Sequence, residues 1–344
     1  MKKTLIIATS PHTRGGITSV VRAHSQGKQW DKYHCYWLTT HRDGNAFLKI
    51  VYIVRALLLG LLLIPFYGII HIHFSEPPSA IRKMVFLIIS KLYRKKVIVH
   101  FHSFSVDTTI KGKYAWVYRY LFLHADAAIV LSNYWKLVVD EEYHLGEKIK
   151  VIYNPCTTTK YKTHYKKENS ILYAGTLNHR KGYADLIRAF SKIAMNHPEW
   201  KVVLAGNGEI EEGKRLAKEL SVDSQVQFLG WVNGEQKDAA YQSASIFCLP
   251  SYAEGFPMAV LDAWAYGLPV ITTPVGGIPD IAEDGENLLL FNPGDVDKLA
   301  GCLETLIDSA VMRETLSKAS LHLAQTTFNI ETINNQIGAL YESF

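Results

Sequence analysis

The stretch SIFCLPSYAEGFPMAVLDAWAYGLPVITTP, from Ser245 to Pro274, carries most of the information about the fold. It opens with a short apolar run that ends at Leu249-Pro250 and continues through a loop. The helix that follows has Pro257 in its first turn and ends at Gly267, as the boundary preferences of proline and glycine predict. A second apolar run, LPVITT, comes directly after it. This order of strand, helix and strand is typical of a βαβ unit in a parallel sheet.

Similar apolar runs alternate with helical stretches along the whole chain. Those of the first half read KTLIIATS, HCYWLTT, GIIHIHF, KVIVHFHS, DAAIVLS and KIKVIYNP, and those of the second half read ILYAG, WKVVLAG, VQFLG, SIFCLP, LPVITT and NLLLF. The alternation predicts the α/β class with parallel sheets. At 344 residues the chain exceeds the roughly 250–300 at which a single core stops growing, so we expect two Rossmann-like domains.

A polar, lysine-rich stretch between Asn154 and Asn169 interrupts the alternation and predicts a linker. We therefore expect an N-terminal domain over residues 1–165 and a C-terminal domain over 166–325. The remaining segment, 326–344, is interpreted as a last helix.

Charge is distributed unevenly between the two halves. Residues 1–170 contain 25 Lys and Arg against 10 Asp and Glu, a net charge of +15, whereas residues 171–344 contain 12 against 22, a net charge of −10. The basic half is expected to face something anionic. No recognition helix or aromatic RNA-binding signature accompanies it, so an anionic membrane leaflet is favoured over nucleic acid. A basic face that only promotes solubility is the alternative.

The cysteines and the first residues indicate the compartment. Cys35, Cys156, Cys248 and Cys302 are scattered without a pairwise motif, which fits a reducing environment. The start, MKKTLIIATSPH, has too short an apolar run for a secretory signal. We expect a cytoplasmic protein, with peripheral contact to the inner face of the plasma membrane as a further expectation.

The most apolar segment, FLKIVYIVRALLLGLLLIPF over residues 47–66, allows three interpretations. Its uncharged part is shorter than the about 20 residues that cross a bilayer, and Pro65 and Gly68 interrupt it. A buried crossover helix is the favoured interpretation. A helix whose outer face enters the membrane interface is the second, which nearby basic residues support, and a transmembrane helix is the third.

Two carboxylates flank the start of the helix that contains Pro257. Glu254 lies just before it, and Asp262, in its first half, leans back toward the same end. Free N–H groups at such a helix start form an anion site at the carboxyl end of a parallel strand. In the alternative interpretation, Glu254 is only a favourable charge near a helix start, and Asp262 is an exposed helix residue.

Glu254 and Asp262, separated by seven residues within EGFPMAVLDAWAYGLPVI, resemble the acidic pair of the GT-B glycosyltransferases of family 4. The resemblance extends through VGGIPDIAEDGENLLLFNPGDVDKLA downstream and through FLGWV, YAGTLNHRKGYADLIRAF and VIYNP upstream. The Gly15-Gly16 loop, IIHIHF and VIVHFHS match more loosely. The resemblance implies a GT-B fold with sheets facing a cleft. The acceptor would bind the first domain, the nucleotide sugar would bind the second, and the last helix, 326–344, would cross back.

The resemblance also implies site residues. Glu254 would accept hydrogen bonds from hydroxyls of the donor sugar, Lys181 would neutralise the diphosphate, and His102 would contact the donor sugar or the acceptor. These three form the implied catalytic set. The implied donor-binding set contains further residues. Gly255 and Phe256 would supply backbone N–H groups, and the Asp262 carboxylate would accept from the ribose hydroxyls. The remaining members are Gly15, Gly16, Thr176, Arg180, Val232 and Pro257.

Two positions depart from the family pattern. The second acid is usually Glu, so Asp262 reaches the ribose with one methylene less, or about 1.5 Å. An Arg often follows the glycine that ends the strand, where this chain has Thr176. Arg180 would supply the missing charge, or Lys181 would act alone.

Two pairs of histidines stand on predicted strands. His71 and His73, and likewise His100 and His102, are two residues apart, so each pair points to one face. They fit substrate contact by at least His102, ordinary strand-end histidines, or a metal site, although no further ligand completes an obvious set. We predict no metal site.

The function implied by the resemblance is a retaining, hexosyltransferase-type transfer in bacterial surface polysaccharide biosynthesis. The donor would be a nucleotide-diphosphate sugar, with a UDP-sugar favoured, and the acceptor a glycan or lipid-linked glycan. No cofactor is expected, and metal independence is implied. A GT-B sugar-nucleotide epimerase and a catalytically inactive nucleotide-sugar-binding protein are the alternatives.

Overall fold

The computed structural model describes residues 2–13, 15–156 and 166–344. They form two compact units, one of Met1–Pro155 with Ile330–Phe344 and the other of Cys156–Asn329. The chain thus changes unit after Pro155 and again after Asn329, where the sequence analysis expected boundaries after residues 165 and 325. The part of the expected linker that spans 157–165 lies outside the described residues.

The first unit is built on a six-stranded sheet in the order β2-β1-β3-β4-β5-β6, and every pair of neighbours is parallel. The strands are β1 (Thr4–Ala8), β2 (Tyr36–Thr39), β3 (Ile69–Phe74), β4 (Lys96–Phe101), β5 (Ala127–Val130) and β6 (Ile149–Val151). Every residue of β1 and β3 is buried, as expected for parallel strands that are covered on both faces.

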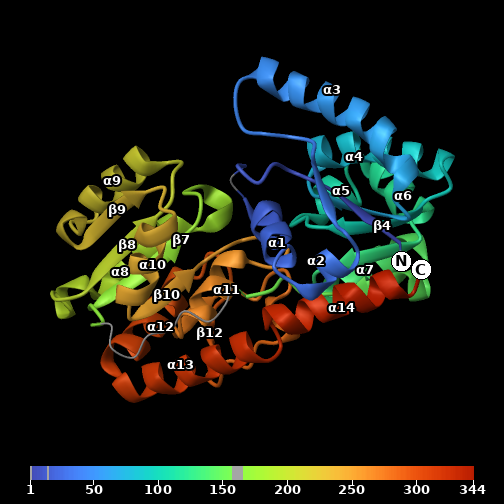
Figure 1. Ribbon diagram of the computed structural model, residues 1–344. Coiled ribbons are helices and arrows are strands. Elements are labelled where there is room, and N and C mark those ends of the chain that lie inside the picture. The colour runs from blue at the N-terminus through green and yellow to red at the C-terminus, as the bar shows by residue number, and fades with distance from the viewer. Residues whose placement is uncertain (1, 14, 157–165) are drawn as a thin grey trace. The chain divides into compact units, whose positions relative to one another are not determined.

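Helices cover both faces of this sheet (Figure 1). They are α1 (Gly16–His24), α2 (Lys28–Lys32), α3 (Ala46–Leu63), α4 (Pro77–Leu92), α5 (Val106–Thr109), α6 (Ala115–His124), α7 (Asn133–Tyr143) and α14 (Ile330–Glu342), with the short 3₁₀ helices η1 (Ile64–Phe66) and η2 (Gly146–Lys148). Side-chain caps begin several of them: Asn45 Oδ1 accepts from the Leu48 N–H at 2.9 Å, and Ser132 Oγ accepts from the Trp135 N–H at 3.1 Å.

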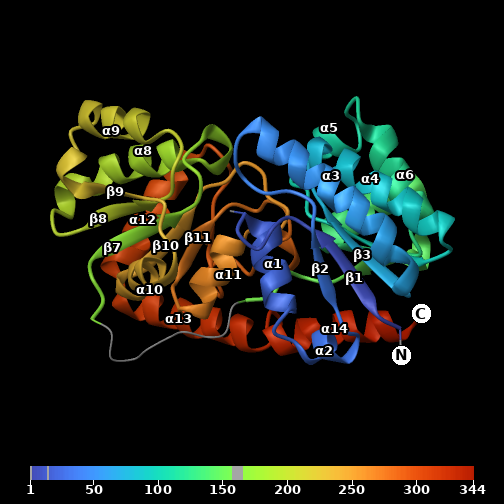
Figure 2. The same ribbon diagram turned by 45° about the horizontal axis from the view of Figure 1, so that its top comes forward.

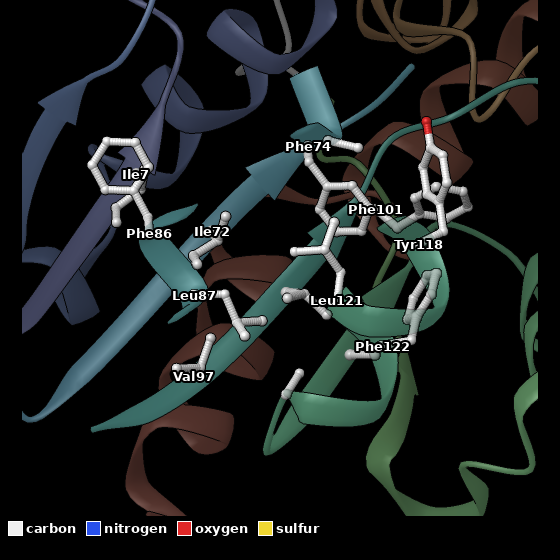
Figure 3. Packing of buried hydrophobic residues seen from close by; sticks show 14 of the residues in the cluster. Ile7, Ile72, Phe74, Phe86, Leu87, Val97, Phe101, Tyr118, Leu121 and Phe122 are labelled. Carbon is white, nitrogen blue, oxygen red and sulfur yellow. The ribbon is translucent and has the colours of Figure 1, made fainter. Parts of the chain in front are cut away.

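Alternate residues of the strands build two separate cores, one on each face of the first sheet. One core joins Ile7 of β1 to Phe86 of α4 and Phe122 of α6 (Figure 3). The other joins Ile6 of β1 to Ile337 of α14. The last helix of the chain therefore belongs to the first unit, because its apolar side covers one face of the first sheet.

The second unit repeats this architecture with a parallel sheet in the order β12-β11-β10-β7-β8-β9. The strands are β7 (Ser170–Ala174), β8 (Lys201–Ala205), β9 (Val226–Gly230), β10 (Ile246–Leu249), β11 (Val270–Thr272) and β12 (Leu289–Leu290). The helices are α8 (Tyr183–Ile193), α9 (Ile210–Glu219), α10 (Gly234–Ser243), α11 (Met258–Ala265), α12 (Val296–Asp308) and α13 (Ala310–Gln325), with η3 (His179–Lys181), η4 (Ala194–Asn196), η5 (Asp223–Gln225) and η6 (Ile278–Asp280).

The strands confirm the predicted α/β class with two Rossmann-like parallel sheets. Of the twelve strands found in the described residues, eleven fall within the apolar runs of the sequence, and β7 begins one residue before its run, at Ser170. The prediction succeeds because strands that are buried on both faces are continuously apolar, while glycine, proline and asparagine mark the turns that bound them.

Helix α3 shows that the favoured interpretation of its segment, a buried crossover helix, was wrong. Only Ala56 and Gly60 of α3 are buried. A Cβ at Gly60 would lie 2.9 Å from Phe86 Cε1, so α3 rests on α4 through small residues. The helical stretch Ala46–Phe66, 21 residues, is long and apolar enough to cross a membrane by length and composition alone, and 17% of its most apolar 18-residue window is buried. Composition could not separate the interpretations, because a protein core and a lipid environment both require apolar side chains.

Candidate active site

Three loops of the second unit meet at the carboxyl ends of the neighbouring strands β7, β10 and β11. The loop after β7 reaches the loop after β10, where the Tyr252 N–H donates to the Arg180 carbonyl at 2.7 Å. The loop after β11 contacts the same segment, because the Gly277 N–H donates to the Gly255 carbonyl at 2.8 Å. Open parallel sheets bind ligands at this edge.

Two glycines allow these loops to approach one another closely. Gly182 has a φ of 68°, and a Cβ there would lie 1.9 Å from the Pro250 carbonyl oxygen. Gly276 has a φ of 62°, and a Cβ there would lie 2.4 Å from the carbonyl oxygens of both Glu254 and Gly255. A side chain at either position would strain the backbone and push the loops apart.

Glu254, in the loop after β10, is buried and surrounded by donors. It is 8% exposed. Its Oε1 accepts from Lys181 Nζ and, at 2.7 Å, from Ser251 Oγ. Arg180 Nη1 lies 3.6 Å from Oε2. A carboxylate that has lost water needs such partners, so this acid is held in position by two cations and a hydroxyl.

Asn178 fixes the backbone that carries the two cations. Its Oδ1 caps η3 by accepting from the Lys181 N–H at 3.0 Å. Arg180 Nη1 also donates to the Ala253 carbonyl at 2.6 Å. The positively charged groups are therefore fixed beside Glu254 by hydrogen bonds as well as by charge.

Asp262 lies on α11 and is 8% exposed, so its interpretation as an exposed helix residue was wrong. Its Oδ2 accepts from Lys237 Nζ at 2.6 Å. Lys237 belongs to α10, which begins two residues after Val232. The contact of Lys237 with Asp262 therefore joins the helix that follows Val232 to α11. Burial, followed by the Asp262 charge, raises the pKa of the Tyr241 hydroxyl well above its ordinary value.

The other predicted donor-binding residues of the second unit lie around these groups. Pro257 is the N-cap of α11. Phe256 is buried, and its ring centroid lies 5.1 Å from that of Phe328 and 6.5 Å from that of Trp264. Thr176, in the loop after β7, is exposed, and its carbonyl accepts from the Tyr173 hydroxyl at 2.9 Å.

In the first unit, Gly15 and Gly16 form the start of α1. Gly15 is the N-cap residue, with a φ of 138°. A Cβ at Gly15 would have no neighbour within 4 Å, so backbone conformation selects glycine there and space does not.

His102 follows β4 and joins a cluster of histidines on the face of the first sheet that α14 covers. His102 Nε2 lies 3.0 Å from His73 Nδ1, and His71 Nε2 lies 3.3 Å from His100 Nδ1. The hydroxyl of Tyr341, on α14, lies 2.6 Å from His71 Nδ1. Adjacent strands place both histidine pairs on one face, since His73 is in register with His100.

Burial keeps this cluster neutral. It lowers the pKa of His102 to about 3. It also lowers the pKa of His24, on α1, to about 4, although the hydrogen bond between His24 and Asn334 raises this pKa in part. Burial, with neighbouring histidines as further causes, also lowers the pKa values of the other three members well below the ordinary value: His71, His73 and His100.

Neutral imidazoles are also the form that binds metals. Ring nitrogens of His71, His73 and His100 lie within 4.8 Å of one another and could hold an ion such as zinc. Hydrogen bonds with other rings and with Tyr341 already engage nitrogens of all three histidines. The absence of a metal site stays a prediction.

Several residues that position the predicted site residues were not themselves predicted from the sequence. Lys237, Ser251 and Asn178 contact or position the predicted site residues, as described above. In the first unit, the Glu76 carboxylate accepts from the hydroxyls of Ser103 and Thr108 and so holds the loop after His102. Only Asn178 left a local signal, a capping residue directly before the short basic turn that contains Lys181.

Family comparisons cover almost all of the chain. Residues 158–322 match the family Glycosyl transferases group 1, and residues 13–160 match Glycosyltransferase Family 4. An uncharacterized glycosyltransferase of Haemophilus influenzae is 31% identical over 211 residues, which are 60% of this chain and 59% of that protein. The putative colanic acid biosynthesis glycosyltransferase WcaL of Salmonella typhimurium is 25% identical over 265 residues, 73% of this chain and 65% of WcaL. The chain thus spans about three fifths of the length of these two relatives.

A solved structure shares the fold over the full length. The crystal structure of Anabaena Alr3699/HepE in complex with UDP-glucose has a TM-score of 0.80 and 19% sequence identity, and the match covers 100% of both chains. At this identity the likeness concerns the fold, which is that of the GT-B glycosyltransferases.

Proposed function

The chain belongs to the group 1 glycosyltransferases of family 4, and we propose that it transfers a hexosyl group from a nucleotide-diphosphate sugar to a glycan or lipid-linked glycan. A UDP-sugar is the proposed donor, which the UDP-glucose named for the Anabaena structure supports. The relative named for colanic acid biosynthesis supports a role in surface polysaccharide biosynthesis.

The observation that carries the proposal is the buried Glu254 carboxylate with Lys181 and Arg180 against it. The two cations neutralise this acid in the structure described here. A nucleotide-diphosphate sugar offers both kinds of partner that the site needs: a diphosphate for the cations and sugar hydroxyls for the carboxylate. Donor binding would replace the Lys181–Glu254 ion pair by Lys181–phosphate and Glu254–hydroxyl contacts without leaving either charge unpaired.

The proposed chemistry retains the anomeric configuration. The bond between the anomeric carbon and the phosphate oxygen breaks, the acceptor oxygen attacks on the same face, and the departing phosphate takes the acceptor proton. Lys181 and Arg180 stabilise the charge that develops on the diphosphate. Asp262 accepts from the ribose, and the Val232 segment contacts the base.

Metal independence is part of the proposal. Lys181, Arg180 and the N–H groups around Gly255 supply positive charge at the edge where a metal ion would otherwise serve. We also propose that the reaction occurs in the cytoplasm, which the four unpaired cysteines support.

Release of nucleotide diphosphate from UDP-, GDP- and ADP-sugars, with and without a membrane lipid extract, tests the proposal. We expect turnover of a UDP-sugar. The lipid extract should stimulate this turnover, a chelator should leave it unchanged, and the product should have the anomeric configuration of the donor. Inversion would exclude the proposed mechanism, and inactivation by chelator that a divalent ion reverses would exclude metal independence. A nucleotide that binds without turnover would favour the inactive binder. Epimerised donor without an acceptor product would favour the epimerase.

A further inference from the structure

Helix α3 carries an apolar stripe on its outer side. Phe47, Val51, Val54, Leu58 and Leu62 recur at helical spacing and are between 40% and 72% exposed. A surface helix of a globular protein normally turns its apolar stripe toward the core. Helix α3 is apolar on both sides, and its small inner residues face α4, so its outer apolar side is left uncovered by the part of the chain that the structure describes.

Helix α4 extends this surface. Ile81, Val85, Ile88 and Leu92 follow the same spacing and are between 36% and 78% exposed. Helices α3, α4 and α6 lie side by side on one face of the first sheet (Figure 1, Figure 2). Single exposed apolar residues are ordinary, but two adjacent stripes form a contiguous patch of the kind that marks an interaction site.

Charge identifies what this patch binds. Helices α3, α4 and α6 contain no Asp or Glu. Lys49 and Arg55 of α3 and Arg119 of α6 are exposed, as is Arg94 just after α4. Helices that combine apolar stripes with basic and no acidic residues complement a surface that is anionic outside and apolar beneath.

We infer that the outer sides of α3, α4 and α6, hereafter the docking face, bind an anionic membrane leaflet, with α3 lying in the plane of the interface. Length does not decide the orientation, because Ala46–Phe66 is 21 residues and could cross the bilayer by length and composition alone, but the inner side of α3 packs on α4 through Gly60. Arg55, an exposed charge within the apolar stretch, opposes a spanning orientation. A second copy of the chain is a poorer occupant, because two such faces would bring like charges together.

This inference deepens the proposed function. Its consequence rests on that function: the acceptor-binding unit would be held where lipid-linked glycans are found. Binding to lipid is measured without turnover. Failure of docking and failure of the proposed transfer are therefore separate results.

Co-flotation with vesicles tests the docking face directly. The parent should bind vesicles that contain phosphatidylglycerol much better than vesicles of phosphatidylcholine alone, and salt raised from about 50 to about 500 mM should weaken the binding. The double variant Val54→Glu with Leu58→Glu should lose binding by about tenfold or more, because it places two carboxylates at the lipid surface.

A matched control comes from the second unit. Val311 and Met195 are 76% and 94% exposed, and the double variant Val311→Glu with Met195→Glu should bind like the parent. Circular dichroism and unfolding midpoints establish that both variants are folded. The inference fails if the parent stays unbound at low salt, or if both double variants lose binding equally. It also fails if the docking face instead holds a dimer that Leu58→Glu dissociates, or if high salt and alkali never release the protein, as expected of a spanning helix.

Discussion

The two units present differently built edges on similar sheets. In the second unit, the carboxyl ends of the strands carry opposite charges in contact, Lys181 with Glu254 and Lys237 with Asp262. In the first unit, neutral histidines that bond to one another and to Tyr341 of the last helix line the sheet face under α14, and this cluster reaches the carboxyl edge at His102. Ion pairs can exchange partners with a charged ligand, whereas buried neutral rings mainly fix the backbone around them. We conclude that the second edge suits the charged donor, and that the last helix of the chain stabilises the histidine face of the first sheet through Tyr341.

The largest effect is expected for Lys181→Ala. Without the amine, Glu254 loses one of its two cations, and the proposed diphosphate loses one of its two counter-charges. Turnover should fall by about 10²–10³-fold, the cost of removing one preorganised group that stabilises developing charge. Nucleotide-diphosphate release measures this. Lys214→Ala, which removes an exposed lysine paired with Glu211 on α9, should stay within about twofold of the parent. A loss of less than about tenfold for Lys181→Ala would remove the distinction between the two edges.

A second large effect should come from Gly182→Ala, which tests whether the loops of the second unit need their close approach. The added Cβ would meet the Pro250 carbonyl at 1.9 Å in a left-handed backbone, so the free energy of unfolding should fall by about 2–4 kcal/mol. Gly301→Ala, on helix α12 with nothing within 4 Å of the new Cβ, should instead gain about 0.5–1 kcal/mol. Urea unfolding measures both. Equal effects of the two substitutions would show that loop contact is unimportant.

Acidification should affect the first unit through its histidines. Their pKa values are lowered in the folded protein, to about 4 for His24 and about 3 for His102, against 6.5 for the unfolded chain. The unfolded state therefore binds more protons below pH 6.5, and the free energy of unfolding falls as the pH decreases from about 6.5 to about 4. A shift as large as that of His24 corresponds to about 3 kcal/mol over this window.

Urea midpoints at pH 7 and pH 5 measure this dependence. The groups that face His24, His71 and their neighbours are the other histidines, Asn334 and Tyr341, and the charge of Lys83 acts on His73. His24→Asn removes one titrating ring and should make the pH dependence shallower. Identical midpoints at the two pH values would contradict a cluster that is kept neutral by burial.

The smallest effect should come from Lys83→Met in α4. Lys83 is fully buried, and its amine donates to the Thr40 hydroxyl. Burial, followed by the charge of Arg82, lowers its pKa well below the ordinary value. Replacing the amine by an apolar group should raise the free energy of unfolding by about 1–2 kcal/mol. Lys91→Met, which removes a partner of Asp126, should lower it instead. A loss of stability in Lys83→Met would mean that the amine has an anionic partner in solution.

Local patterns of the sequence were sufficient for the fold and for part of the candidate site. Strand runs and the proline and glycine at the ends of α11 are local signals, which is why Glu254 could be placed in a loop at a helix start. Lys237 reaching Asp262 and Tyr341 reaching His71 are contacts between distant segments, and a single sequence does not encode them in any local pattern. The exposure of α3 was missed for a different reason, since its composition is compatible with a core and with lipid alike.

The most direct test of the central claim compares the parent with Glu254→Ala in nucleotide-diphosphate release from a UDP-sugar with membrane lipid extract as the source of acceptor. Our account predicts turnover by the parent and a fall of about 10²–10³-fold in the variant, with Val311→Glu unchanged. Equal release by the parent and Glu254→Ala would contradict it, because the buried acid and its two cations would then have no part in transfer.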